Sequence, residues 1–218
     1  MVKFSNDVDV LKYEPALFGE LHLPSQVQAS GSDAVLNGTT LAAPRADFLA
    51  SHVEAGGVVY LRSLDGSREG AYEIVSVDSP TQLTVSVVRA DPTSPPVAPA
   101  VGGEVFYRIS TLGPQAVDAA LQLTQLLGLR PGDPSRSIGP DNLIEVEGLR
   151  RASALLVIAN VYATWAGQGQ GKCFADKSRH YQQLFEKARQ RCRVSVDLGS
   201  DGVADVHRID GVVRLVRD

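Results

Sequence analysis

The spacing of hydrophobic residues predicts helices near the start and in the middle of the chain. Residues 7–21 place apolar side chains on one helical face, and Pro15 divides this stretch into a short first helix and a second that starts near Glu14. Residues 114–127 return to the same spacing, and Gly128 is placed to end that helix.

Two longer helices are predicted after a connection rich in proline and glycine. Residues 142–165 form the first, and its segment 152–166 is apolar nearly all round, which is typical of a helix buried in a bundle or at a subunit contact. Residues 174–193 form the second, which is amphipathic. Its apolar stripe consists of Phe174, Tyr181, Leu184, Phe185 and Ala188.

Between these helical regions, residues 26–110 alternate in short apolar and polar runs separated by glycine, proline and aspartate. Such runs at regular spacing predict a small β-barrel or sandwich. The proline-rich residues 91–100 are expected to form an exposed loop, because proline donates no ladder hydrogen bond. The candidate strands are residues 34–36, 58–64, 71–77, 82–89 and 105–109.

The last 26 residues, 193–218, contain three alternating runs punctuated by Asp201-Gly202 and Asp210-Gly211. This pattern predicts a small antiparallel β-unit, since Asp-Gly pairs favour tight turns. The terminal strand has unpaired backbone groups on at least one edge, and such an edge is either protected or adds to another chain's sheet. The candidate partner-binding residues are Val212, Val213, Arg214, Leu215, Val216 and Arg217.

Together these elements predict an α+β protein with a helical bundle core interrupted by a small β-barrel or sandwich insert. Residues 1–24 and 111–193 are expected to form the helical core, and residues 25–110 the β-rich insert. Residues 194–218 are expected to form a C-terminal β-hairpin and assembly tail.

Composition is that of an ordinary globular protein able to bury a real core, with 218 residues of which 44% are hydrophobic. No run approaches the ~18 apolar residues of a membrane span, and the N-terminus lacks the apolar core of a secretory signal. We therefore expect folding in the cytoplasm, with no membrane partner. The two cysteines, Cys173 and Cys192, are expected to be free thiols.

The net charge of −4 conceals a segregation along the chain. Residues 1–149 carry 9 Lys and Arg against 18 Asp and Glu, whereas residues 150–193 carry 9 against 2. This basic segment indicates contact with a nucleic acid or an acidic partner, and the alternative is a solvated helix face. The candidate residues for lining a DNA channel or contacting an acidic partner are Lys177, Arg179, Lys187, Arg189 and Arg191.

Nothing in the sequence indicates an enzyme or a cofactor. The glycine-rich residues 167–172 resemble a phosphate loop, but they follow a helix, and Lys172 precedes Cys173 rather than Ser or Thr. They are better interpreted as a loop between helices. The four histidines lack metal-ligand spacing, and a G-x-S-x-G serine motif is absent.

A calcium loop is the alternative interpretation of the terminal β-unit. Asp197, Asp201 and Asp205 match part of the D-x-[DN]-x-[DN]-G pattern, in which carboxylates converge on a hard cation. However, Gly199 occupies the third ligand position, and Arg208 stands at the twelfth, where a bidentate Glu is needed. A plain hairpin is therefore the preferred prediction, with a calcium-stabilised binding module as the alternative.

The order of these elements resembles tailed-phage neck proteins, the head-to-tail connector or adaptor proteins, in a variant that carries a β-barrel inserted into the helical core. The resemblance extends over nearly the full chain and includes no catalytic signature. It rests on residues 10–15 (VLKYEP), 72–77 (YEIVSV) with 83–86 (LTVS), Pro114-Gln115, 197–205 (DLGSDGVAD) and 213–217 (VRLVR).

The resemblance implies a non-enzymatic structural protein of the virion neck, assembled in the host cytoplasm. Proteins of this group form a homo-oligomeric ring, commonly of about twelve copies, beneath the portal. The ring joins head to tail and extends the DNA channel. The implied partners are the portal protein, tail or tail-completion proteins, and double-stranded DNA that passes without sequence recognition.

Overall fold

The computed structural model describes residues 2–128, 142–167, 172–197, 201–209 and 212–215. Within these residues the protein is α+β, with four α-helices, a closed antiparallel barrel of six strands and a second sheet formed mainly by C-terminal strands. Contacts divide the chain into two compact units, one of Asn6–Leu112 and one of Met1–Ser5 with Gly113–Asp218.

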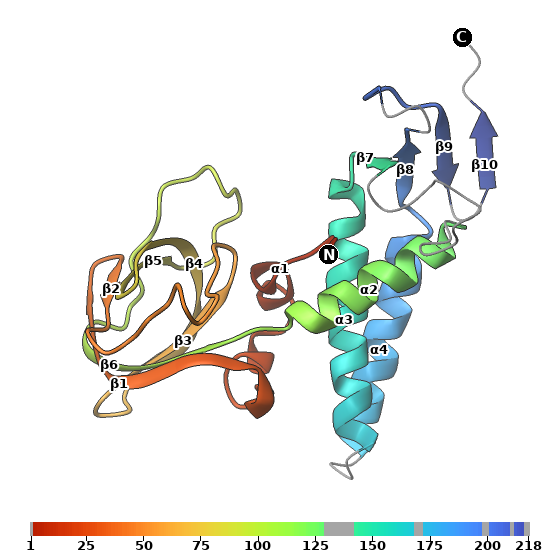
Figure 1. Ribbon diagram of the computed structural model, residues 1–218. Coiled ribbons are helices and arrows are strands. Elements are labelled where there is room, and N and C mark those ends of the chain that lie inside the picture. The colour runs from red at the N-terminus through yellow and green to blue at the C-terminus, as the bar shows by residue number, and fades with distance from the viewer. Residues whose placement is uncertain (1, 129–141, 168–171, 198–200, 210–211, 216–218) are drawn as a thin grey trace. The chain divides into compact units, whose positions relative to one another are not determined.

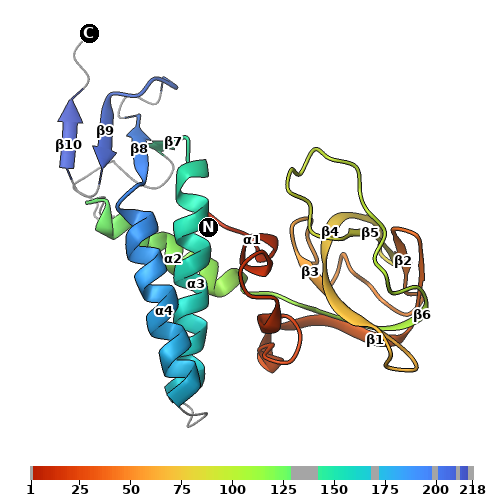
Figure 2. The ribbon, with the colours of Figure 1, turned by 180° about the vertical axis from the view of Figure 1, so that it is seen from behind.

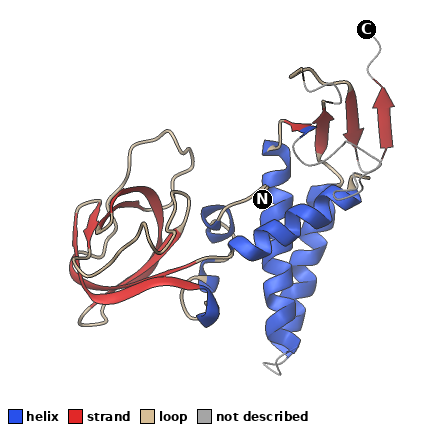
Figure 3. Cartoon of the chain, viewed as in Figure 1, coloured by secondary structure: helices blue, strands red, loops and turns tan. Residues whose placement is uncertain are grey.

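The first unit contains the barrel, which Figure 3 shows as strands curved around a common centre. Adjacent strands are antiparallel in the order β1-β2-β5-β4-β3-β6, and β6 pairs with β1 to close the barrel. The sequence pattern predicted a barrel or a sandwich without deciding between them, and the structure shows a closed barrel. Its strands are β1 (Val27–Asn37), β2 (Thr40–Ala42), β3 (Val58–Ser63), β4 (Glu69–Ser79), β5 (Gln82–Ser86) and β6 (Gly103–Ser110).

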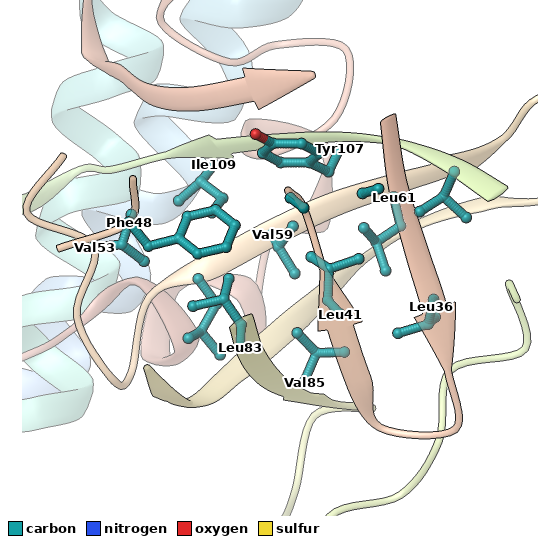
Figure 4. Close-up of a cluster of buried hydrophobic side chains, with 14 of the residues drawn as sticks. Leu36, Leu41, Phe48, Val53, Val59, Leu61, Leu83, Val85, Tyr107 and Ile109 are labelled. Atoms are coloured by element: carbon teal, nitrogen blue, oxygen red, sulfur yellow. The ribbon is translucent and has the colours of Figure 1, made fainter. Parts of the chain in front are cut away.

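Alternation along these strands produces the barrel core, because successive side chains of a strand point to opposite faces. The inward positions are apolar and almost fully buried, and the ring of Phe48 packs edge-on against Tyr107, with 5.9 Å between ring centroids. Figure 4 shows this cluster, which includes Leu36, Leu41, Val53, Val59, Leu61, Leu83, Val85 and Ile109.

The chain enters this unit through α1 (Asp7–Leu11), which begins with a capping box between Asn6 and Asp9. The predicted second helix is only a short 3₁₀ turn, Pro15–Leu17. Arg108 of β6 donates hydrogen bonds to the carbonyls of Phe18 and Gly19, at 3.2 and 2.6 Å. Residues 6–24 therefore belong to the same compact unit as the barrel, whereas their sequence pattern predicted that they belong with the later helices.

The second unit contains α2 (Gly113–Leu126), α3 (Glu147–Gly167) and α4 (Lys172–Arg189). Figures 1 and 2 show α3 and α4 side by side and antiparallel, with α2 crossing them. Most of α3 is buried, as its apolar sequence predicts. Tyr162 of α3 is the largest of the fully buried side chains in the described residues.

Two predicted helix boundaries are wrong, since strands occupy the helix ends. The third helix starts at Glu147 rather than residue 142, because Leu143–Ile144 forms β7 and Glu145 then turns the chain with a φ of 61°. The fourth ends at Arg189 rather than residue 193, since Arg193–Val196 forms β8.

The second sheet follows from the antiparallel pairing of the helices. That pairing brings β7, which precedes α3, beside β8, which follows α4. The sheet continues through β9 (Val206–Ile209) to β10 (Val212–Leu215), and neighbouring strands are antiparallel in the order β10-β9-β8-β7. The three predicted C-terminal strands are therefore confirmed, and β7 is a fourth that the sequence did not predict.

Candidate functional site

Lys177, one of the four predicted contact residues on α4, has a partner on α3. Its ammonium nitrogen lies 2.9 Å from the hydroxyl oxygen of Tyr162 and 4.9 Å from the centre of that ring. Phe174 and Tyr181 stack against the same ring, with centroid separations of 5.8 and 6.0 Å. Lys177 therefore belongs to the α3–α4 interface within the chain.

Two further predicted contact residues form ion pairs within one turn of their own helix. Arg179 lies 3.0 Å from the carboxylate of Asp176, and Arg189 lies 3.0 Å from that of Glu186. Pairs at this spacing stabilise a helix by a few tenths of a kcal/mol. These arginines are partly neutralised, so they are weaker candidates for binding an external anion.

The remaining two, Lys187 and Arg191, lie beside a hollow of about 250 Å³ between α3 and α4. Arg151 of α3 lies on the same hollow. All three side chains are exposed, and within the described part of the chain none of them has an ion pair or hydrogen bond. The other lining residues are Gly148, Ala152, Leu184, Ala188 and Cys192.

Cys192 contacts both helices that form the walls of this hollow. Its thiol is buried and contacts the carbonyl oxygens of Gly148 on α3 and Ala188 on α4, at 3.3 and 3.4 Å. Burial raises the pKa of the Cys192 thiol, although Arg189 opposes that shift. The sulfur is therefore a neutral structural group at physiological pH, and both cysteines are free thiols.

Arg151 is a functional candidate that the sequence reasoning did not single out. It lies in the first turns of α3, 40 residues before Arg191 in the chain. The only signal available was its membership of the basic segment 150–193. The antiparallel arrangement of α3 and α4 brings the two arginines together, and periodicity within either helix does not report that arrangement.

The second candidate feature is the outer edge of the C-terminal sheet. β10 pairs with β9 along one side, with Val212 opposite Ile209 and Leu215 opposite Val206. No strand in the described residues pairs with its other side. Four of the predicted partner-binding residues, Val212, Val213, Arg214 and Leu215, form this edge strand, whereas Val216 and Arg217 lie outside the described residues.

Two of the three aspartates of the possible calcium loop accept backbone hydrogen bonds. The carboxylate of Asp197 accepts from the N–H groups of Asp201 and Gly202, at 3.3 and 2.7 Å, and that of Asp201 accepts from Val203, at 2.9 Å. The described residues contain no group of three or more His, Cys, Asp or Glu side chains placed to hold a metal ion. Gly199 lies outside the described residues.

Comparisons with protein-family models, with curated proteins and with solved structures found no match. None of the helices in the described part of the chain combines the length and the apolar character needed to cross a bilayer. The features of this chain that bear on its function are the element order, the basic hollow and the sheet edge.

Proposed function

We propose that the chain is a structural head-to-tail adaptor of a tailed bacteriophage. In this proposal, a ring of identical subunits lies below the portal, joins the head to the tail and extends the DNA channel. The partners are neighbouring copies, the portal protein and tail or tail-completion proteins, and the ring is assembled in the host cytoplasm. No chemical step is required of the subunit.

The observation that carries the proposal is the open edge of β10. An edge strand presents a row of backbone N–H and C=O groups that another chain can extend by adding a strand. In a closed ring, each subunit uses one surface to meet a different surface of its neighbour. A strand at the end of a sheet suits such a contact, because backbone pairing needs only an extended segment on the partner.

The helices supply the second line of support. We propose that α2, α3 and α4 are the helical bundle core of each subunit, with the barrel as an insert. A rigid core is needed because the ring must hold its diameter while DNA passes. The strongly buried α3 provides such a core.

The charge of the barrel unit supports a passive channel. Residues 6–112 carry 13 Asp and Glu against 6 Lys and Arg. An acidic surface does not hold the phosphate backbone tightly, so DNA passes such a surface without being retained.

The sheet edge is tested by removing residues 212–218 and measuring the mass of the assembled particles. β10 pairs only with β9 within the described residues, so the shortened chain should keep its helices, as circular dichroism would show. We expect its assembly to be weaker by at least about tenfold, since several backbone hydrogen bonds are lost.

A matched variant separates backbone pairing from side-chain contact. Val212→Thr with Val213→Thr keeps a good strand former at both positions. If backbone pairing drives assembly, this variant assembles much like the full chain. Normal assembly of the shortened chain would show that β10 is not the contact.

A further inference from the structure

We propose that the hollow lined by Arg151, Lys187 and Arg191 is a binding site for a phosphate-class oxyanion. The proposal goes beyond the adaptor function and does not depend on it. A chain that fails to form rings is still expected to bind such an anion at this place.

The charges that line the hollow are all positive. Three cationic side chains line one hollow of about 250 Å³, and no Asp or Glu of the described residues lines it. Like charges around a shared space repel one another, so a bound anion relieves a cost that the empty site carries. A phosphate monoester or pyrophosphate carries about two or more negative charges at neutral pH and matches this site better than a single carboxylate does.

The arginines of α3 and α4 that lie away from the hollow have acidic partners within one turn of their own helix. Arg150, the immediate neighbour of Arg151, pairs with Glu147 at 2.9 Å. Arg179 and Arg189 on α4 pair with acidic residues of their own helix. Arg150, Arg179 and Arg189 are thus neutralised within the chain, whereas the three basic side chains around the hollow have no ion pair within the described residues.

The walls of the hollow are also suited to holding a compact anion. Gly148, Arg151 and Ala152 belong to the first turns of α3, where backbone N–H groups give the helix a partial positive charge. Guanidinium groups offer planar pairs of donors that match two phosphate oxygens. The small side chains of Ala152 and Ala188 leave room for a single compact group between the two helices.

The phosphate group has two sources that share this chemistry: a small phosphate or pyrophosphate ion, and the backbone of a nucleic acid. Calorimetry on the full chain with pyrophosphate, and in parallel with a short DNA duplex at several salt concentrations, distinguishes them. Saturable pyrophosphate binding identifies the small ion. Binding of the duplex alone, with a steep dependence on salt, identifies the nucleic acid backbone.

The site is tested with the double variant Arg151→Gln and Arg191→Gln. Its matched control is Arg150→Gln with Arg179→Gln, which also removes two positive charges, one from α3 and one from α4. We expect the first variant to bind the probe at least about tenfold more weakly, because two charge-assisted hydrogen bonds are lost, and the control to bind normally. Circular dichroism checks that both variants are folded.

Three results would overturn the proposal. The first is that neither probe binds the unchanged chain. The second is equal weakening in both double variants, which would indicate a diffuse effect of net charge rather than a site. The third is binding of polyglutamate in preference to both phosphate probes, which would indicate a docking place for an acidic polypeptide.

Discussion

The ammonium group of Lys177 donates a hydrogen bond to the buried hydroxyl of Tyr162, across 2.9 Å between α4 and α3. Tyr162 is fully buried, so its hydroxyl needs a partner inside the protein. Lys177 provides that partner while its charge lies near the face of the same ring. A lysine that the sequence suggested for external contact is thus part of the helix packing.

Replacing Tyr162 with Phe should lower the free energy of unfolding by about 1 kcal/mol, because Lys177 loses its acceptor while the ring remains. Urea denaturation followed by circular dichroism measures this change. Lys187→Met is the control, since Lys187 has no partner within the described residues, and its effect should stay within about 0.5 kcal/mol. Equal effects of the two substitutions would contradict the structural role of the Tyr162–Lys177 pair.

This contrast shows which parts of the site the sequence could predict. Composition located the basic segment correctly, because charge is a local property of the sequence. It could not separate Lys177 from Lys187, since the partner of Lys177, Tyr162, lies on another helix and the Lys187 side chain has none within the described residues. Arg151 and β7 were not predictable for the same reason, because each acquires its role through residues that lie far away in the sequence. β7 is also only two residues long and pairs with β8.

The strands of the barrel were predictable where β-branched and aromatic residues cluster in the sequence. Residues 58–64 and 105–109 are rich in β-branched and aromatic residues, and both form strands. β1 starts at Val27, before the predicted residues 34–36, and its pairing with β6 shifts register between Val27 and Ala29 and between Gly31 and Ala34. Closure of the barrel depends on the pairing of β1 with β6, which lie far apart in sequence, so local pattern left barrel and sandwich equally open.

Arg89 fastens the proline-rich loop to the barrel. Its guanidinium lies 2.7 Å from the carboxylate of Glu73 and also donates to the carbonyls of Pro92 and Ser94, each at 2.7 Å. The Arg89 and Glu73 side chains are only 9% and 8% exposed. Arg89→Ala should therefore destabilise the barrel by about 2 kcal/mol, since Glu73 is left without its main partner.

Thermal unfolding measures this loss, and Arg45→Ala is its control. Arg45 is 88% exposed and lies 3.9 Å from Asp33, so its removal should cost less than about 0.5 kcal/mol. A small effect at Arg89 would mean that the loop is held by its other contacts.

Asp197 should stabilise the C-terminal sheet without a metal ion. Its carboxylate accepts backbone N–H groups from Asp201 and Gly202, so Asp197→Ala should lower stability by about 1 to 3 kcal/mol. The loss should be the same in calcium and in EDTA. A melting temperature that rises with calcium, and ceases to do so in Asp201→Ala, would instead support the calcium-stabilised binding module.

The most direct test of the adaptor proposal is negative-stain electron microscopy of the full chain, alone and mixed with a tailed-phage portal protein encoded in the same genome. The proposal predicts rings of this chain stacked coaxially on the portal, with a continuous central channel. Fields that contain only monomers, even in the presence of portal, would contradict it.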